Sequence, residues 1–322
     1  MREPLDSHCL KVVKAMERGQ VVPLLGAGAN LCDRPPDCAW DAEFHPPSGA
    51  ELSGLLADEF GYPLADRTEL ARVSEYVELA AGEGPLYERL RDIFDAEYPP
   101  NSVHRFLAAL PASLEAKGKG HLHQLVITTN YDDILERAFS DAGESYEVVV
   151  YMAGGEDHGR FVHCLADGER RLIERPNEYT GLSFDTCSVI LKIHGAIDRG
   201  DEARDSFVVS EDDYIEYLTH ANLSQLVPVS VLARLRRSHF LFLGYRMRDW
   251  NLRVMLHRLF RERDHGYRSW AVQLAPDMVD EELWSRREVD VVDVALSEYV
   301  EELTRQLEAA APAAPAAPRV GA

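Results

Sequence analysis

Residues 125–139 read LVITTNYDDILERAF, an apolar run that passes through polar residues into a helical pattern. The run is apolar on both faces, which is typical of a parallel strand covered by helices on each side. Thr129, Asn130 and Asp132 follow at its carboxyl end, where open α/β sheets bind their ligands. The same residues are good helix caps, so an alternative is that Asn130 or Asp132 only begins the helix.

Other segments on either side of this one repeat the alternation of buried strand and amphipathic helix. Because strands that alternate with helices build parallel sheets, we predict an α/β fold with a doubly wound, Rossmann-like parallel sheet. The further predicted strands are VVPLLG (21–26), SVILKIHG (188–195), HFLFLGY (239–245) and SWAVQLA (269–275), and the predicted helices cover 4–18, 48–60, 132–140 and 250–262.

The remaining segments suggest insertions into one domain over residues 1–310. Residues 51–121 show several helical patterns and no convincing strand, which predicts an inserted helical module. Residues 144–186 are mixed, with a strand at YEVVVY (146–151), and EVDVVDVA (288–295) predicts an edge strand before a last helix. Residues 311–322 are Ala/Pro-rich and predict a flexible tail.

The charge of the chain excludes some classes of partner. Its 322 residues include 34 Lys and Arg against 55 Asp and Glu, a formal net charge of −21. Such a charge repels phosphate backbones and anionic lipids, so we expect no direct nucleic acid and no membrane as partner. No apolar run approaches the ~18 residues that span a bilayer, and the start lacks a signal-peptide pattern, so we expect a cytoplasmic protein.

Five cysteines occur at irregular spacings without a CxxC pair. Disulfide frameworks and structural zinc sites need paired, closely spaced thiols. We therefore expect reduced cysteines and no metal.

Small residues follow the first predicted strand. Gly26, Ala27, Gly28 and Asn30 stand where a backbone could approach a phosphate and hold its oxygens with free N–H groups. A tight turn that needs glycine for its dihedral angles is an equally good explanation of these residues.

Two more strand ends carry polar residues to the same edge. SVILKIHG ends in Lys192, His194 and Gly195, and a histidine facing the crevice could act as a general base near neutral pH. HFLFLGYRMRDWN adds Gly244, Tyr245 and Asp249. A histidine near a strand end is more often structural, but this one would face the same crevice as Asn130.

Four motifs in order, GAGAN, TTNYDD, KIHG and LGYRMRDWN, together resemble the sirtuin-like domain over residues 15–275, and are most similar to its bacterial branch that hydrolyses NAD in antiphage defence. In sirtuins the glycine loop holds the NAD pyrophosphate, and the Asn, Asp and His surround the nicotinamide ribose. The resemblance implies Asn130, His194 and Asp132 as catalytic residues. It implies NAD binding by Gly26, Ala27, Gly28, Asn30, Thr129, Gly244, Tyr245 and Asp249.

Deacylating sirtuins carry two zinc-binding CxxC pairs, which this sequence lacks. The resemblance therefore implies NAD as substrate and water as acceptor, with nicotinamide and ADP-ribose as products. The alternatives are a non-hydrolysing NAD- or ADP-ribose-binding regulatory subunit and a zinc-free protein deacylase. The resemblance further suggests a homo-oligomer and a partner, which would be an ATPase or helicase of the HerA type or another defence protein. The Arg-rich stretch 234–263 is either a solvated helix face or a self-association surface.

Overall fold

The computed structural model describes residues 3–35, 38, 40–41, 44–219, 227–246 and 267–309, with Leu218 described by its backbone alone. The predicted helix over 250–262, Asp249 and the Ala/Pro-rich residues 311–322 lie outside these residues.

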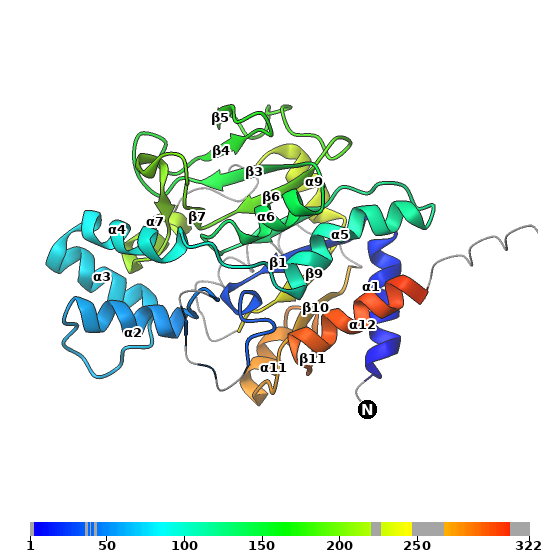
Figure 1. The fold of residues 1–322 in the computed structure, drawn as a ribbon, viewed down its shortest axis with the longest axis horizontal. Helices are drawn as coiled ribbons and strands as arrows, with labels where there is room; N and C mark the ends of the chain where they lie inside the picture. The colour runs from blue at the N-terminus through cyan, green and yellow to red at the C-terminus, as the bar shows by residue number, and fades with distance from the viewer. Residues whose placement is uncertain are drawn as a thin grey trace, which may run out of the picture.

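The described residues form a nine-stranded sheet in the order β11-β10-β9-β1-β2-β6-β3-β4-β5, which confirms the predicted fold class (Figure 1). The two strands at one edge, β4 (Phe161–Cys164) and β5 (Arg170–Ile173), run antiparallel to their neighbours. The parallel strands are β1 (Val21–Leu25), β2 (Leu125–Thr128), β3 (Tyr146–Tyr151), β6 (Ser188–Lys192), β9 (His239–Leu243), β10 (Ser269–Val272) and β11 (Val289–Val292).

Successive side chains of the central strands enter opposite layers of core. Val22 and Leu24 of β1 pack into one hydrophobic cluster, while Val21 and Leu25 pack into the other. This period of two is what a strand buried on both faces requires. The first cluster is covered by α7 (Glu211–Thr219), α9 (Val229–Arg236) and α11 (Met278–Ser285), and the second by α1 (Leu5–Met16), α5 (Ser102–Ala116), α6 (Ile134–Asp141) and α12 (Leu296–Ala309).

Three helices form a module with its own core beside the sheet (Figure 1). They are α2 (Gly49–Glu59), α3 (Leu70–Ala81) and α4 (Glu83–Phe94), and their apolar faces meet Tyr131 and Phe207. Helix α5 lies in the same predicted range, 51–121, but its Leu107 packs into the sheet core. The range thus divides between the module and the layer that covers the sheet.

The chain reverses direction across the sheet at β1. It runs from β1 to β2 and on to β3, β4 and β5 at one edge, returns to β6 between β2 and β3, and then crosses to β9 on the other side of β1. Such a reversal leaves a crevice at the carboxyl ends of the two strands that flank it, here β1 and β9. The loops after β1, β2, β6 and β9 therefore share one edge, which is where the sequence places its candidate residues. In the described ranges, every helix is too short or too polar to cross a bilayer.

Candidate active site at the carboxyl edge of the sheet

The loop after β1 packs backbone against backbone on the end of β9. Gly244 has φ 76°, and a Cβ there would lie 2.0 Å from the nitrogen of Ala29. The N–H groups of Gly26 and Gly28 donate to the carbonyl oxygens of Leu243 (3.0 Å) and Gly244 (3.1 Å). The expectation that these two N–H groups are free for a phosphate is therefore wrong, because the neighbouring strand end uses them. The glycines serve this close approach instead.

One carbonyl oxygen joins three strand ends. Leu25, the last residue of β1, accepts hydrogen bonds from the backbone N–H of Thr129 (3.1 Å) and the hydroxyl of Tyr245 (3.0 Å). The Tyr245 side chain is 8% exposed and lies against Gly26, where a Cβ would come within 2.8 Å of its ring. The Tyr245 ring thus packs against the loop that follows β1, here called the glycine loop (residues 26–30).

Three buried polar side chains form a continuous hydrogen-bonded chain at this edge. Nδ2 of Asn130 donates to Oδ1 of Asn30 (3.1 Å), and Nδ2 of Asn30 donates to Oδ2 of Asp132 (2.7 Å). Each side chain is at most 9% exposed, and the backbone N–H of Asn130 is held by Oγ1 of Thr128 (3.0 Å). A satisfied network of this kind fixes the rotamers of its members.

Asp132 also serves the helix that follows it. Its Oδ1 accepts a hydrogen bond from the N–H of Ile134 (3.1 Å) at the start of α6. The N-cap residue of α6 is Asp133, so neither Asn130 nor Asp132 is the cap that the alternative proposed.

The backbone carbonyl of Asp132 accepts from Nζ of Lys192, a lysine that is 1% exposed and pairs with Glu136 at 2.7 Å. Burial raises the pKa of Glu136, against the opposing charge of Lys192. This pair, of which Lys192 is fully buried and Glu136 largely buried, holds the turn that presents Asp132.

His194 stands on the neighbouring strand end. Thr128 of β2 pairs with Lys192 of β6, so Asn130 and His194 both lie two residues beyond a paired position. The His194 ring meets the rings of Tyr214 and Tyr217 edge-on, with centroids 5.3 and 5.8 Å away. Burial lowers the pKa of His194 to about 4, so the imidazole is neutral at physiological pH.

The backbone around His194 is tied to the second motif. Its carbonyl accepts from the N–H of Val208 (2.9 Å), and the carbonyl of Val208 accepts from the hydroxyl of Tyr131 (2.7 Å). Gly195 follows at φ 87°, where a Cβ would lie 2.0 Å from the carbonyl oxygen of Ser206. Among the described residues, none hydrogen-bonds to the His194 ring, so the structure joins Asn30, Asn130 and Asp132 directly and His194 only through the strand register.

Asn101 is a supporting residue that the sequence analysis missed. Its Nδ2 donates to the carbonyl of Ala29 (2.8 Å), while its Oδ1 caps α5 by accepting from the N–H of Val103 (3.1 Å). An Asn directly before an apolar helical run is a sequence signal for a cap. The contact with the glycine loop has no such signal, because it joins residues 72 positions apart.

A cavity of about 540 Å³ lies away from the candidate active site. It opens between α4, the loop that joins β3 to β4, strands β4 and β5, and η2 (Glu202–Arg204), with Glu83, Asp157 and Arg170 among its lining residues. Asn130 and His194 do not line it.

Comparison with known proteins identifies the fold. Residues 124–292, more than half of the chain, match the family model of the SIR2-like domain. The chain is 26% identical over 209 residues to the NAD(+) hydrolase ThsA of Cytobacillus dafuensis, covering 64% of this chain and 34% of that protein. It is 24% identical over 296 residues to defense-associated sirtuin 2 of Bacillus subtilis, covering 89% and 24%. A second ThsA, from Acinetobacter baumannii (strain 532279), is 25% identical over 254 residues, covering 77% and 41%.

The chain thus spans between a quarter and about two fifths of the length of these relatives. The matched range contains Asn130, His194 and Gly244, and the structure adds the glycine loop, which precedes that range, to the same edge. The chain belongs to the SIR2-like family.

Proposed function

We propose that this chain is an NAD⁺ hydrolase that converts NAD⁺ and water into nicotinamide, ADP-ribose and a proton. The observation that carries the proposal is the Asn130–Asn30–Asp132 chain of hydrogen bonds beside His194, at the point where the sheet reverses direction. Two of the similar proteins are named as NAD(+) hydrolases, which supports the same chemistry here.

NAD would lie across the loops of β1 and β9. The pyrophosphate is assigned to the loop of Gly26, Ala27 and Gly28, in which Ala27 is exposed. The N–H groups of Gly26 and Gly28 already donate to carbonyl oxygens at the end of β9. These two glycines would therefore let the pyrophosphate approach the backbone closely, and would not donate hydrogen bonds to it. The other proposed contacts are Asn30, Thr129, Gly244 and Tyr245, and Asp249 remains a prediction outside the described residues.

Cleavage of the bond between ribose and nicotinamide needs little acid catalysis. The pyridinium already carries a positive charge, so nicotinamide leaves as a neutral molecule. What needs stabilisation is the positive charge that develops on the ribose. We assign Asn130 to hold the ribose or the attacking water, with its rotamer fixed by Asn30. The neutral His194 accepts the proton of a ribose hydroxyl or of that water. Asp132 supports the carboxamide or the developing charge.

In a cell such an enzyme would deplete NAD during phage infection, as an effector in the cytoplasm. We further propose a homo-oligomer and control by a partner, such as a HerA-type ATPase or another defence protein. Arg236, Arg237 and Arg246 are exposed and are candidates for a self-association surface. Arg234 is not, because it donates to the carbonyl of His123 (3.0 Å) inside the protein. The other arginines of the 234–263 stretch lie outside the described residues.

The test is chromatography of NAD⁺ incubated with the purified chain at several protein concentrations, with the oligomer mass measured in parallel. We expect nicotinamide and ADP-ribose in equal amounts, and loss of turnover in Asn130→Ala and His194→Ala. The matched controls Asn177→Ala and His158→Ala change exposed or partly exposed side chains and should keep full activity.

Intact NAD⁺ at every concentration and oligomeric state would refute the proposal. Binding of NAD⁺ without cleavage would favour the regulatory subunit instead. Deacylation of an acyl-lysine peptide with NAD⁺ consumption would favour the deacylase.

A further inference from the structure

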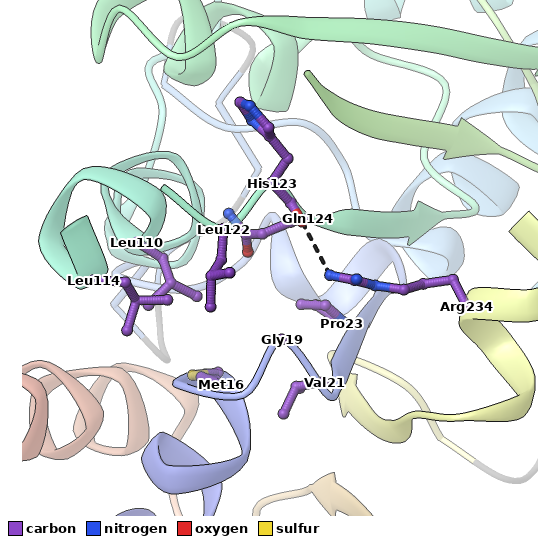
Figure 2. A pocket seen from close by; sticks show the side chains of 10 residues that line it. All are labelled: Met16, Gly19, Val21, Pro23, Leu110, Leu114, Leu122, His123, Gln124 and Arg234. Atoms are coloured by element: carbon purple, nitrogen blue, oxygen red, sulfur yellow. Dashed lines mark hydrogen bonds between the residues drawn. The ribbon is translucent and has the colours of Figure 1, made fainter. Parts of the chain in front are cut away.

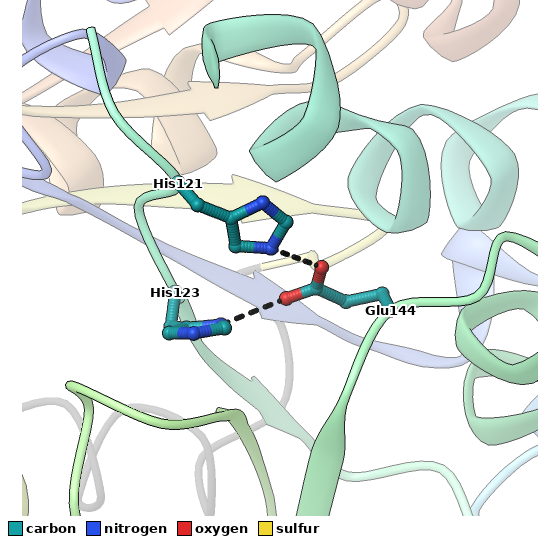
Figure 3. Close-up of side chains that lie close together, drawn as sticks. All are labelled: His121, His123 and Glu144. Carbon is teal, nitrogen blue, oxygen red and sulfur yellow. Dashed lines mark hydrogen bonds and ion pairs between the residues drawn. The ribbon is translucent and has the colours of Figure 1, made fainter.

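A cluster of two histidines and one glutamate lies at the opposite, amino-terminal edge of the sheet. His121 and His123 belong to the segment between α5 and β2, and Glu144 to the segment between α6 and β3. Alternate residues of an extended segment point to the same side, which brings both imidazoles onto one carboxylate (Figure 3). The sequence analysis predicted no metal.

The donor atoms of the cluster are spaced as metal ligands are. Nε2 of His121 lies 2.7 Å from Oε2 of Glu144, and Nδ1 of His123 lies 3.0 Å from Oε1. One donor atom from each residue falls within 4.8 Å of the others. Bonds of 2.0–2.1 Å to a tetrahedral zinc ion separate neighbouring ligand atoms by about 3.3 Å. The two histidine–carboxylate distances would open by a few tenths of an ångström to admit the ion, and the widest separation, which is at most 4.8 Å, would close toward this value.

Neighbouring side chains orient the cluster. Nδ1 of His121 lies 2.8 Å from Oε2 of Glu115, which favours the tautomer whose Nε2 lone pair faces the cluster. The hydroxyl of Ser188 donates to Oε1 of Glu144 (2.8 Å) and accepts from the N–H of Gln124 (2.9 Å). A ligating histidine backed by a carboxylate and a ligating carboxylate held by a hydrogen bond are the usual surroundings of a bound metal.

The backbone of His123 is anchored from the far side. Arg234 donates to its carbonyl oxygen (3.0 Å) beside a cavity of about 10 Å³ that both residues line (Figure 2). Figure 2 shows the ring of His123 pointing away from this cavity. The guanidinium of Arg234 thus contacts the backbone carbonyl of His123, while the ring of His123 contacts Glu144 in the cluster.

Burial and charge also favour a cation here. The side chain of Glu144 is only 3% exposed, and its ion-pair partners among the described residues are the two histidines, with no Lys or Arg at that distance. The side chain of His121 is 33% exposed, so one side of the cluster is open to water. A buried carboxylate with an open side can receive an ion and leave a position for a water ligand.

We propose that His121, His123 and Glu144 bind one Zn²⁺ ion, with water as fourth ligand and Glu115 as the residue that orients His121. Imidazole and carboxylate donors together suit zinc, whereas Mg²⁺ and Ca²⁺ prefer oxygen ligands alone. The ion would fasten the segments that enter β2 and β3 to the end of α5. It stabilises the fold at the edge away from Asn130 and His194 and takes no part in the reaction proposed there.

The test uses the full chain, dialysed against a chelator and then titrated with Zn²⁺ by calorimetry, with thermal unfolding and Co²⁺ absorption as further readouts. We expect one ion per chain, a raised Tm, a tetrahedral Co²⁺ spectrum and no competition from excess Mg²⁺. His121→Ala, at the partly exposed ligand, should abolish saturable binding in a chain whose circular dichroism is unchanged. Glu115→Gln should weaken binding about 10-fold.

His158→Ala is the matched control, because His158 pairs with Glu216 at 2.9 Å and is not a member of the cluster. It should retain the full stoichiometry. A wild-type chain without saturable Zn²⁺ binding, or a His121→Ala chain that binds as tightly as wild type, would overturn the proposal. Neither readout depends on NAD⁺ cleavage, so this result is independent of the proposed function.

Discussion

Asn30 and Asp132 are joined by a 2.7 Å hydrogen bond between residues 102 positions apart, from Nδ2 of the amide to Oδ2 of the carboxylate. Because Asn30 accepts with its oxygen from Asn130, it can keep both neighbours in fixed rotamers. We therefore expect Asn30 to position Asn130, besides the contact with NAD that is proposed for it.

Removing this link should lower turnover while the fold persists. In Asn30→Ala, Asn130 and Asp132 lose their shared partner, and a misplacement of about 1 Å costs roughly 100-fold in rate. We expect kcat for NAD⁺ cleavage to fall by about this factor with a smaller change in KM. Steady-state kinetics beside Asn177→Ala measure it, and unchanged kcat would show that Asn130 is held by other contacts.

Gly244→Ala should disrupt the glycine loop. The added Cβ would lie 2.0 Å from the nitrogen of Ala29, and Gly244 also has φ 76°. Gly143→Ala is the matched control, because Gly143 has φ 69° and nothing within 4 Å of its Cβ. In urea unfolding, we expect a loss of about 1–2 kcal/mol for Gly143→Ala, from the dihedral angle alone. Gly244→Ala should lose more than this and lose NAD⁺ cleavage, and equal losses would argue against the close contact.

Lys192→Met should destabilise the protein strongly, because it leaves Glu136 buried without a cation. Breaking one side of a buried pair typically costs about 3–5 kcal/mol, whereas replacing both partners by apolar residues costs far less. We therefore expect Lys192→Met with Glu136→Leu to be more stable than Lys192→Met alone. Urea unfolding of the two single variants and the double variant forms the cycle. A double variant with the summed losses would mean that the two side chains are not coupled.

Stability should fall in acid because of His104. Burial lowers its pKa from an ordinary 6.5 to about 4, so between these values the unfolded chain binds the proton and the folded chain does not. The free energy of unfolding thus decreases as the pH drops from 6.5 to 4, by about 3 kcal/mol for a shift of this size.

His104→Gln tests this, because Gln at the third helical position can still accept from the N–H of Asn101, as Nδ1 of His104 does at 3.3 Å. The variant should lose less stability than wild type between pH 6.5 and pH 4 in urea titrations. Equal losses would place the acid sensitivity in other groups.

The sequence determined the elements of this protein. Runs such as VVPLL and SVILK are apolar on both faces, and β1, β6 and the other predicted strands appear within a few residues of their predicted ends. The motif residues were placed at strand ends for the same local reason, since polar residues follow where a buried strand stops. The cap at Asn101 was also readable, because capping depends on neighbours in sequence.

The tertiary structure alone decided which strand ends meet and what their side chains do there. The N–H groups of Gly26 and Gly28 donate to carbonyl oxygens at the end of β9. These bonds depend on the strand order, which brings residues over 200 positions apart into contact. The bonds of Asn30 to Asp132 and of Glu144 to His121 and His123 arise in the same way, between loops that no local pattern connects. Propensity and periodicity act over a few residues, whereas these contacts exist because the packed sheet holds distant loops at fixed positions.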